Sequence, residues 1–200
     1  MKKGITKEHI VDAALALADG QTMPMHTVGF RDIARLVGCA HTNLYNYFDS
    51  YDALLWAAQE EILRRLQSAI EVRLEQAAGF FDALEAFFGG MLDMYLAHPG
   101  WFYLAWHERL QTPRPKSHYD LTVSTVDAMV AALTAVFERA GQHVDAQDMR
   151  MNLHNVHAYI HGELSIYLAG RGLLREEAPF REYTVRQAAR MLRLLADGRR

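Results

Sequence analysis

The sequence predicts an all-α fold, and three observations support this prediction. Apolar residues recur every three or four positions along almost the whole chain, as they do on one face of a helix. The sequence contains no alternating β-branched run bounded by hairpin turns. Hydrophobic residues make up 50% of the 200 residues, which is enough to bury a sizeable core. We therefore expect about nine helices, with Pro and Gly residues at the joints between them.

The first three helices are expected to be short. The first should cover about residues 6–19, because Thr6 is a favourable N-cap. The second is expected at about residues 30–37, where Gly38 can adopt the left-handed conformation that ends a helix. The third is expected at about residues 41–48.

The helices beyond residue 50 are expected to be longer. Ser50 is a suitable N-cap for the first of them, and Asp52 in its first turn suits the positive end of the helix dipole. Pro and Gly residues separate the remaining periodic segments. The expected ranges are about 50–79, 80–97, 101–111, 116–140, 146–169 and 179–196.

Composition and charge place few limits on the partner. The formal net charge is −3, and residues 1–56 carry five Lys or Arg against six Asp or Glu, or 5 − 6 = −1. The single cysteine, Cys39, can form no internal disulfide, and we expect it to be a small core residue. Lys2 and Lys3 are not followed by an apolar block of the signal-peptide type, so we expect a cytoplasmic protein.

Residues 30–55 have the pattern of a helix-turn-helix. Two short helices flank Gly38, and the second carries Leu44 and Phe48 four residues apart on one face. Its other positions are polar or aromatic, and such side chains can hydrogen-bond base edges and phosphates. We expect base contacts from His41, Thr42, Asn43 and Asn46. We expect further DNA contacts, mainly to the backbone, from Arg31, Tyr45, Tyr47 and Tyr51.

The stretch FRDIARLVGCAHTNLYNYFDSYDALL resembles the DNA-binding motif of the tetracycline-repressor (TetR) family. The matching positions, in order and spacing, are Arg31-Asp32-Ile33-Ala34, Gly38, Leu44-Tyr45-Asn46-Tyr47-Phe48, Ser50 and Leu54-Leu55. The resemblance covers residues 5–57. It implies a helix-turn-helix DNA-binding domain in residues 1–57 and a ligand-binding and dimerisation domain in residues 58–200. It further implies a homodimer that binds double-stranded DNA at a palindromic operator.

Three positions depart from the family pattern. Gly29 stands where Ser or Thr often caps the helix, Ala40 replaces the usual Ser, and Tyr51 replaces the usual Lys. The last change removes a cation from the start of a helix, and the charge of −1 weakens the attraction to phosphates. An alternative therefore stays open: a helical small-molecule or metal-binding protein whose helix-turn-helix has lost its DNA affinity.

Aromatic and methionine side chains are concentrated around one expected helix joint near residue 100. Such a cluster is either core or the lining of an apolar cavity, with a few polar groups that orient a small molecule. The candidate ligand-binding residues are Met91, Tyr95, Trp101, Tyr103, Trp106, His107 and Asn155.

Three histidines, His154, His157 and His161, share one helix face. Imidazoles bind transition metals, but no HExxH pattern or cysteine pair accompanies them, so we expect an interhelical or interface role and no metal site. The sequence has no nucleophile elbow, phosphate loop or dinucleotide-binding glycine pattern. We therefore expect no catalytic residue and no cofactor, with an enzyme that uses the histidine face as a third alternative.

Two apolar stripes lie near the C-terminus. In TetR-like proteins two such helices commonly pair with their symmetry mates, although either stripe is equally suited to a core. The stripes are Leu153, Val156, Ile160, Leu164 and Leu168, and Val185, Ala188, Ala189, Leu192 and Leu195. Taken together, the sequence predicts a ligand-responsive homodimeric repressor, released from DNA by a small, largely apolar or aromatic effector and without a membrane partner.

Overall fold

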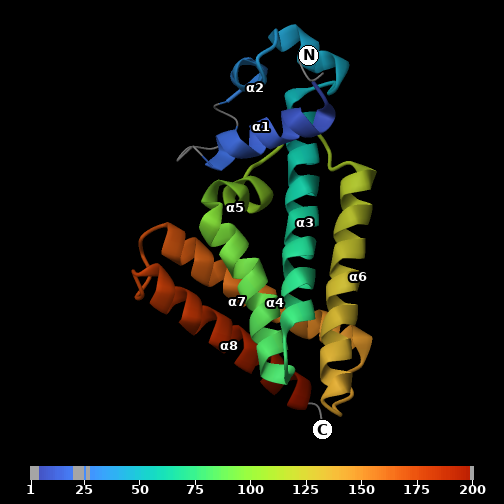
Figure 1. The fold of residues 1–200 in the computed structure, drawn as a ribbon, viewed down its shortest axis with the longest axis vertical. Helices are drawn as coiled ribbons and strands as arrows, with labels where there is room; N and C mark the ends of the chain where they lie inside the picture. Colours follow the sequence, from blue (N-terminus) through green and yellow to red (C-terminus); the bar gives the residue numbers. More distant parts are fainter. Residues whose placement is uncertain (1–4, 20–24, 26–27, 199–200) are drawn as a thin grey trace. The chain divides into compact units, whose positions relative to one another are not determined.

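The computed structural model describes residues 5–19, 25 and 28–198. Lys2 and Lys3 lie outside these residues. The described chain is all-α, as predicted, with eight α-helices, the 3-10 helix η2 and no strand (Figure 1). The elements are α1 (Lys7–Asp19), α2 (Phe30–Val37), η2 (His41–Asn46), α3 (Tyr51–Gln76), α4 (Phe80–Ala97), α5 (Pro99–Trp106), α6 (Lys116–Arg139), α7 (Ala146–Leu168) and α8 (Glu177–Asp197).

The chain divides into two compact units. Unit 1 comprises Met1–Arg65 and Ala97–Thr122, and unit 2 comprises Leu66–Leu96 and Val123–Arg200. Helices α3 and α6 each contribute residues to both units. Unit 1 thus contains the helix-turn-helix segment together with α5, which contacts α1. The functional boundary that we expect at residue 57 stays a prediction.

Local signals set the helix boundaries in the first part of unit 1. Thr6 Oγ1 accepts the N–H of His9 (3.3 Å) at the start of α1, and Ser50 Oγ accepts the N–H of Ala53 (3.0 Å) at the start of α3. Gly38 adopts the left-handed conformation with φ 76° and ends α2, as predicted. Cys39 follows it and is half-buried, less enclosed than we expected.

The helix expected at residues 41–48 is shorter and tighter in the structure. It is a 3-10 helix that ends at Asn46. The N–H of Asn43 donates to Ala40 O (2.9 Å), and the N–H of Tyr47 donates to Leu44 O (3.0 Å). These bonds span three residues rather than four, which is common in helices of this length.

Helix α5 also ends earlier than expected, at Trp106 rather than near residue 111. The N–H of His107 donates to Tyr103 O (2.9 Å) and closes the last turn. The N–H of Glu108 donates to the same oxygen (2.9 Å), and beyond the helix the carboxylate of Asp52 accepts the N–H groups of Gln111 (2.7 Å) and Thr112 (2.8 Å). A partner 59 residues away in the sequence therefore holds the chain that follows this helix.

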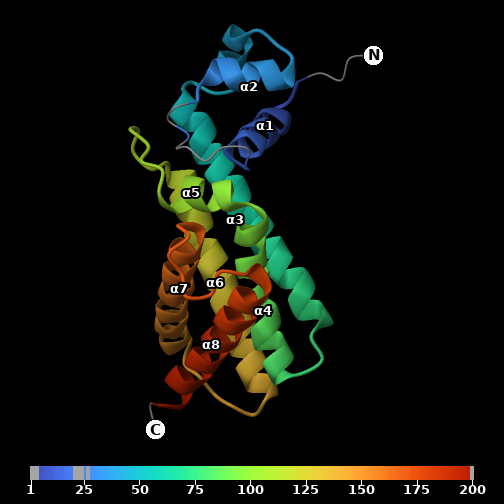
Figure 2. The ribbon, with the colours of Figure 1, turned by 90° about the vertical axis from the view of Figure 1, so that its left-hand side faces the viewer.

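The core of unit 2 is built from α4, α7, α8 and parts of α3 and α6. Helices α7 and α8 pack side by side as an antiparallel pair (Figure 2). Their predicted apolar stripes are buried except at the final positions, Leu168 and Leu195, which are half-buried. The rings of Tyr167 and Phe180 stack at 4.1 Å between centroids where the two helices are joined. Each fully buried large apolar side chain in such a core contributes roughly 1.5–3 kcal/mol.

Helix α6 is long and rich in apolar residues. Among the described helices it is the one that is long and apolar enough to cross a membrane by length and composition alone. The buried core helix of a soluble protein passes the same test. Its side chains Val130, Leu133, Val136 and Phe137 are all buried in unit 2, and Phe137 makes an edge-to-face contact with Phe80 at 5.0 Å between centroids.

Candidate nucleic-acid interface and effector site

The 3-10 helix η2 presents almost all of its side chains to solvent. Leu44 is fully buried, and Phe48 just beyond the helix is buried as well. The remaining helix positions, His41, Thr42, Asn43, Tyr45 and Asn46, are all exposed. One side of the segment therefore anchors it to unit 1, and the other displays the hydrogen-bonding groups that suit base edges and phosphates.

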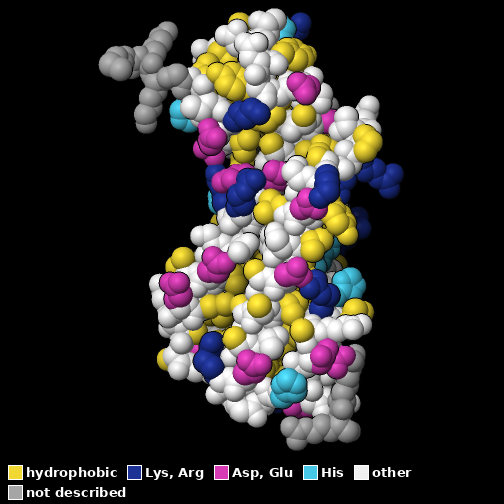
Figure 3. Space-filling model, turned by 90° about the vertical axis from the view of Figure 1, so that its right-hand side faces the viewer, with side chains coloured by type: hydrophobic (Ala, Val, Ile, Leu, Met, Phe, Trp, Pro, Cys, Tyr) yellow, Lys and Arg dark blue, Asp and Glu magenta, His cyan; other side chains and the backbone are white. Residues whose placement is uncertain are grey.

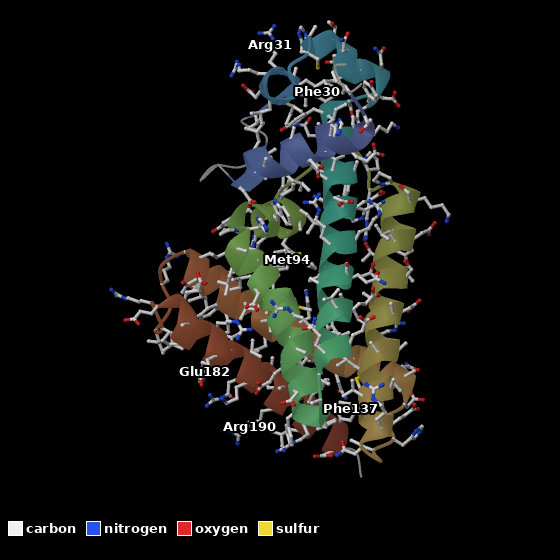
Figure 4. The ribbon with its side chains drawn as sticks, viewed as in Figure 1. Phe30, Arg31, Met94, Phe137, Glu182 and Arg190 are labelled. Atoms are coloured by element: carbon white, nitrogen blue, oxygen red, sulfur yellow. The ribbon has the colours of Figure 1, made fainter. Side chains whose placement is uncertain are left out.

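An aromatic contact fixes the orientation of η2 against α2. The ring of Phe30, the first residue of α2, meets Tyr45 edge-to-face at 4.9 Å and Tyr51 edge-to-face at 5.8 Å between centroids. Phe30 itself is buried, whereas Tyr45 is 55% exposed. Tyr45 thus packs by its ring and leaves part of its surface accessible. The next residue of α2, Arg31, points outward into solvent (Figure 4).

The other two tyrosines predicted to contact DNA have partners inside unit 1. The Tyr47 hydroxyl donates to Ile5 O (2.9 Å), and the Tyr51 hydroxyl donates to Met25 O (3.1 Å). Burial and the nearby carboxylate of Glu108 raise the pKa of Tyr51. Both hydroxyl protons are therefore used within the chain, and Tyr45 is the tyrosine of this set that is most exposed.

Basic residues near this surface are sparse. Arg31 and Arg35 are exposed on α2, and Arg35 lies 3.5 Å from Asp32 Oδ1. Lys7 places its ammonium 5.6 Å from the centroid of the Phe48 ring. On the face of the molecule in Figure 3, Lys and Arg side chains are interspersed with Asp and Glu rather than gathered into one basic patch. This distribution agrees with the charge of −1 counted from residues 1–56.

The start of α3 has a role that the sequence did not reveal. Like Asp52, two further residues of α3 bind α5 or the chain after it. Trp56 Nε1 donates to Thr112 Oγ1 (3.1 Å), and Gln59 Nε2 donates to Leu104 O (2.9 Å). Asp52 was predicted to serve only the dipole of its own helix. No signal in the sequence links these three residues to a segment about 50 residues further on.

The seven candidate ligand-binding residues do not lie together in either unit. Met91 and Tyr95 are buried on α4 in unit 2, whereas Asn155 is exposed on α7. The other four belong to unit 1, where Trp101 is buried and Tyr103, Trp106 and His107 are exposed. Tyr103, His107 and Asn155, the polar groups expected to orient a small molecule, are thus all exposed, and their role stays a prediction.

Trp101 has a clear structural role in unit 1. Its indole N–H donates to Leu15 O (3.1 Å), and its ring stacks on that of His98 at 3.7 Å between centroids. His98 Nδ1 in turn lies 2.5 Å from Asp19 Oδ2. Burial raises the pKa of Asp19 despite this partner. These contacts join α5 to the end of α1.

The histidine face of α7 is only partly exposed. His154 is exposed, whereas His157 and His161 are half-buried, with their ring centroids 6.1 Å apart. Burial lowers the pKa of His157 to about 4, and electrostatic repulsion from His161 and His154 contributes to the same shift. Across residues 5–19, 25 and 28–198, no group of three His, Cys, Asp or Glu side chains is placed to hold a metal ion.

Comparisons with known proteins give matches in structure but not in sequence. No protein-family model matches the chain, and no curated protein matches it. A protein of unknown function from Rhodococcus sp. RHA1 superposes with a TM-score of 0.78 at 20% identity, covering 98% of each chain. A tetR-family transcriptional regulator from Streptomyces coelicolor has a TM-score of 0.71 at 17% identity, covering 95% of this chain and 82% of that one.

A third match is the transcriptional regulator FadR from Bacillus subtilis, solved in complex with stearoyl-CoA. Its TM-score is 0.67 at 14% identity, and the alignment covers 98% of this chain and 100% of that one. The chain has the fold of the TetR-family transcriptional regulators. The TetR-like fold implied by the resemblance over residues 5–57 is therefore confirmed, with alignments that cover 92–98% of this chain.

Within this TetR-like fold, unit 2 carries an open groove of about 500 Å³ beside two arginines of α3 and α8. Asp93 of α4 accepts from Arg73 Nη1 (2.6 Å) and from Arg181 Nε (2.5 Å). Burial raises the pKa of the Asp93 carboxyl, but hydrogen bonds from the two guanidinium groups outweigh it and leave the pKa below its usual value. Gly89 leaves room for both guanidinium groups, because a Cβ atom there would lie 3.2 Å from Arg181 Nη2. The three charged residues connect α3, α4 and α8 within unit 2.

Proposed function

We propose that the protein is a ligand-responsive, DNA-binding transcriptional regulator that acts as a cytoplasmic repressor. The observation that carries this proposal is the division of η2 into a buried anchor, Leu44, and an exposed set of hydrogen-bonding side chains, within a TetR-like fold. His41, Thr42, Asn43 and Asn46 are placed in solvent, where they are free to meet base edges. Tyr45 and Arg31 are the exposed residues that suit phosphates.

The proposed DNA-bound form is a homodimer on a palindromic operator. Two copies of η2 would read two half-sites about 34 Å apart, one helical turn along the duplex. An effector that binds better to a form with a different spacing shifts the population away from DNA. Helix α3 runs without interruption from the helix-turn-helix into unit 2, which makes it the natural element to carry that change.

The proposed effector is small and largely apolar or aromatic. Support comes from the apolar character of the residues around α4 and α5, and from FadR of Bacillus subtilis, a protein of the same fold whose structure contains stearoyl-CoA. Of the predicted ligand-binding residues, Met91 and Tyr95 are the buried pair in unit 2. They are the first positions to substitute once an effector has been found.

The experiment that tests the proposal is selection of bound duplexes from a random DNA pool at low salt, followed by fluorescence anisotropy on the enriched sequence across a range of salt. We expect a palindromic consensus and a log-log slope of several units, because each neutralised phosphate contributes about −0.9 to the slope. Arg31→Ala should reduce the slope by about 1. Arg64→Ala is the control, since Arg64 on α3 pairs with Glu60 (3.1 Å).

A second candidate function is a helical ligand-binding protein that has lost DNA affinity. The observation in its favour is Tyr51, which stands where the family has Lys and donates its hydroxyl proton to Met25 O. The first turn of α3 therefore offers no cation to a phosphate. If the pool yields no consensus and binding does not depend on salt, with or without candidate effectors, this second function replaces the first.

A further inference from the structure

The 3-10 geometry of η2 sorts its side chains onto three edges. A 3-10 helix has three residues per turn, so side chains at positions i and i+3 lie one above the other. In an α-helix, with 3.6 residues per turn, the same two side chains would be about 60° apart around the axis. The three edges of η2 are His41 with Leu44, Thr42 with Tyr45, and Asn43 with Asn46.

Two of these edges are used within unit 1. Leu44 is fully buried and anchors the first edge. Tyr45, on the second edge, packs its ring against Phe30 of α2 at 4.9 Å between centroids. His41 and Thr42 are exposed, and each stands one turn before one of these anchoring residues. The first two edges therefore hold η2 in its place.

Asn43 and Asn46 form the third edge, and both are exposed. Within the described part of the chain, neither side-chain amide has a hydrogen-bond partner. Three residues at a rise of about 2.0 Å each place these two positions about 6 Å apart along the helix axis. Two base-pair steps of duplex DNA span about 6.8 Å, which is close to this distance. The third edge therefore carries two amides at a spacing that suits neighbouring base pairs.

An asparagine amide matches adenine in the major groove. Its N–H donates to adenine N7 while its oxygen accepts from the N6 amino group, which makes the contact bidentate. On guanine the same oxygen would face O6, which is itself an acceptor, and guanine is read most often by Arg or Lys. None of the six residues of η2 is Lys or Arg, and Arg31 and Arg35 belong to α2. The free edge of η2 therefore suits adenine.

We propose that Asn43 and Asn46 each read an adenine, so that every operator half-site contains two A·T pairs within two base-pair steps of each other. This inference rests on the proposed DNA-binding function and names the sequence class that the same site takes. It assigns the base readout to one edge of η2, whereas the other two edges position the helix.

Selection from a random DNA pool with the full chain and three variants tests this assignment. The unaltered protein should select two adenines in each half-site. Asn43→Ala and Asn46→Ala should each keep one adenine and accept any base at the other position, where about 5- to 150-fold discrimination is lost. Thr42→Ala, an exposed residue on the second edge, is the matched control and should select the unaltered consensus. All four proteins should have equal melting temperatures, because the substituted side chains are exposed.

A base analogue tests the hydrogen bond itself. 7-Deazaadenine has a C–H group in place of N7 and still pairs with thymine, so it removes the acceptor for the asparagine N–H. At either selected adenine it should weaken binding by about two- to tenfold, as expected for one hydrogen bond. The loss at one adenine should disappear in Asn43→Ala and the loss at the other in Asn46→Ala. The log-log salt slope should stay unchanged in both variants, since no phosphate contact is removed.

The outcomes separate this inference from the function on which it rests. A consensus that lacks the two adenines, or that stays the same in both asparagine variants, overturns the inference alone, because other groups then read the operator. A 7-deazaadenine effect that persists in both variants also overturns it. A pool that yields no consensus contradicts the proposed function and, with it, this inference.

Discussion

A Cβ atom on Gly100 would lie 1.9 Å from the carbonyl oxygen of Ala18. The backbone of α5 therefore approaches the last turn of α1 so closely that no side chain fits between them. The neighbouring bond from Trp101 Nε1 to Leu15 O fixes the same contact one turn earlier on α1. This pair of helices is thus joined within unit 1 by a close backbone approach as well as by the side chain of Trp101.

Gly100→Ala is expected to destabilise the protein by about 3 kcal/mol or more, because the obstructing atoms belong to backbone and cannot move aside as a side chain would. Chemical denaturation followed by circular dichroism measures this change. Gly162→Ala is the matched control. Its added Cβ would meet no atom within 4 Å, and the same change within α7 should leave stability equal or raise it by about 0.5–1 kcal/mol. Equal effects of the two variants would contradict the close approach.

Tyr45→Phe and Tyr47→Phe are expected to have opposite consequences. Tyr45 keeps its ring contact with Phe30 as phenylalanine, so the melting temperature should not change, while loss of the exposed hydroxyl should weaken operator binding several-fold. Tyr47→Phe removes the bond to Ile5 O and should lower stability by about 1 kcal/mol. Anisotropy with the selected operator and thermal unfolding separate the two effects. Unchanged operator binding by Tyr45→Phe would exclude the hydroxyl as a phosphate contact.

Asp52→Ala is expected to release the chain after α5. Its carboxylate is the acceptor for the N–H groups of Gln111 and Thr112, and removing it leaves both without that acceptor. We expect a loss of about 1–3 kcal/mol and faster hydrogen exchange at these two amides. Asp49→Ala, at an exposed position just before α3, is the control and should leave exchange at residues 111 and 112 unchanged. Unchanged exchange in Asp52→Ala would contradict the bond.

Stability is expected to fall in mild acid because of His157. Its pKa is lowered in the folded protein to about 4, below the ordinary value of 6.5, so the unfolded chain takes up a proton first as the pH falls. The contribution of neutral His157 to the free energy of unfolding is roughly 2–3 kcal/mol. It is complete above about pH 6.5 and is lost progressively as the pH falls towards 4. His157→Gln should flatten the denaturation profile in this window. His154→Gln, at an exposed position of the same helix, should not.

Several features of this protein follow from short stretches of sequence. The bounds predicted for α2 and α4 agree with the structure, because Gly38 after α2 and the His98-Pro99 step after α4 act on their own turn of backbone. The burial of Leu44 and the exposure of its neighbours in η2 follow from helical spacing alone. Such signals act over a few residues, so the sequence contains them completely.

Other features depend on where distant parts of the chain meet. The chain after α5 is held by Asp52, and the hydroxyl of Tyr47 donates to Ile5 O, 42 residues away. A side chain's partner is set by the path of the folded backbone, which periodicity does not specify. The sequence by itself therefore determined the helices and the motif, while the tertiary structure decided which of the motif's side chains are available to a partner.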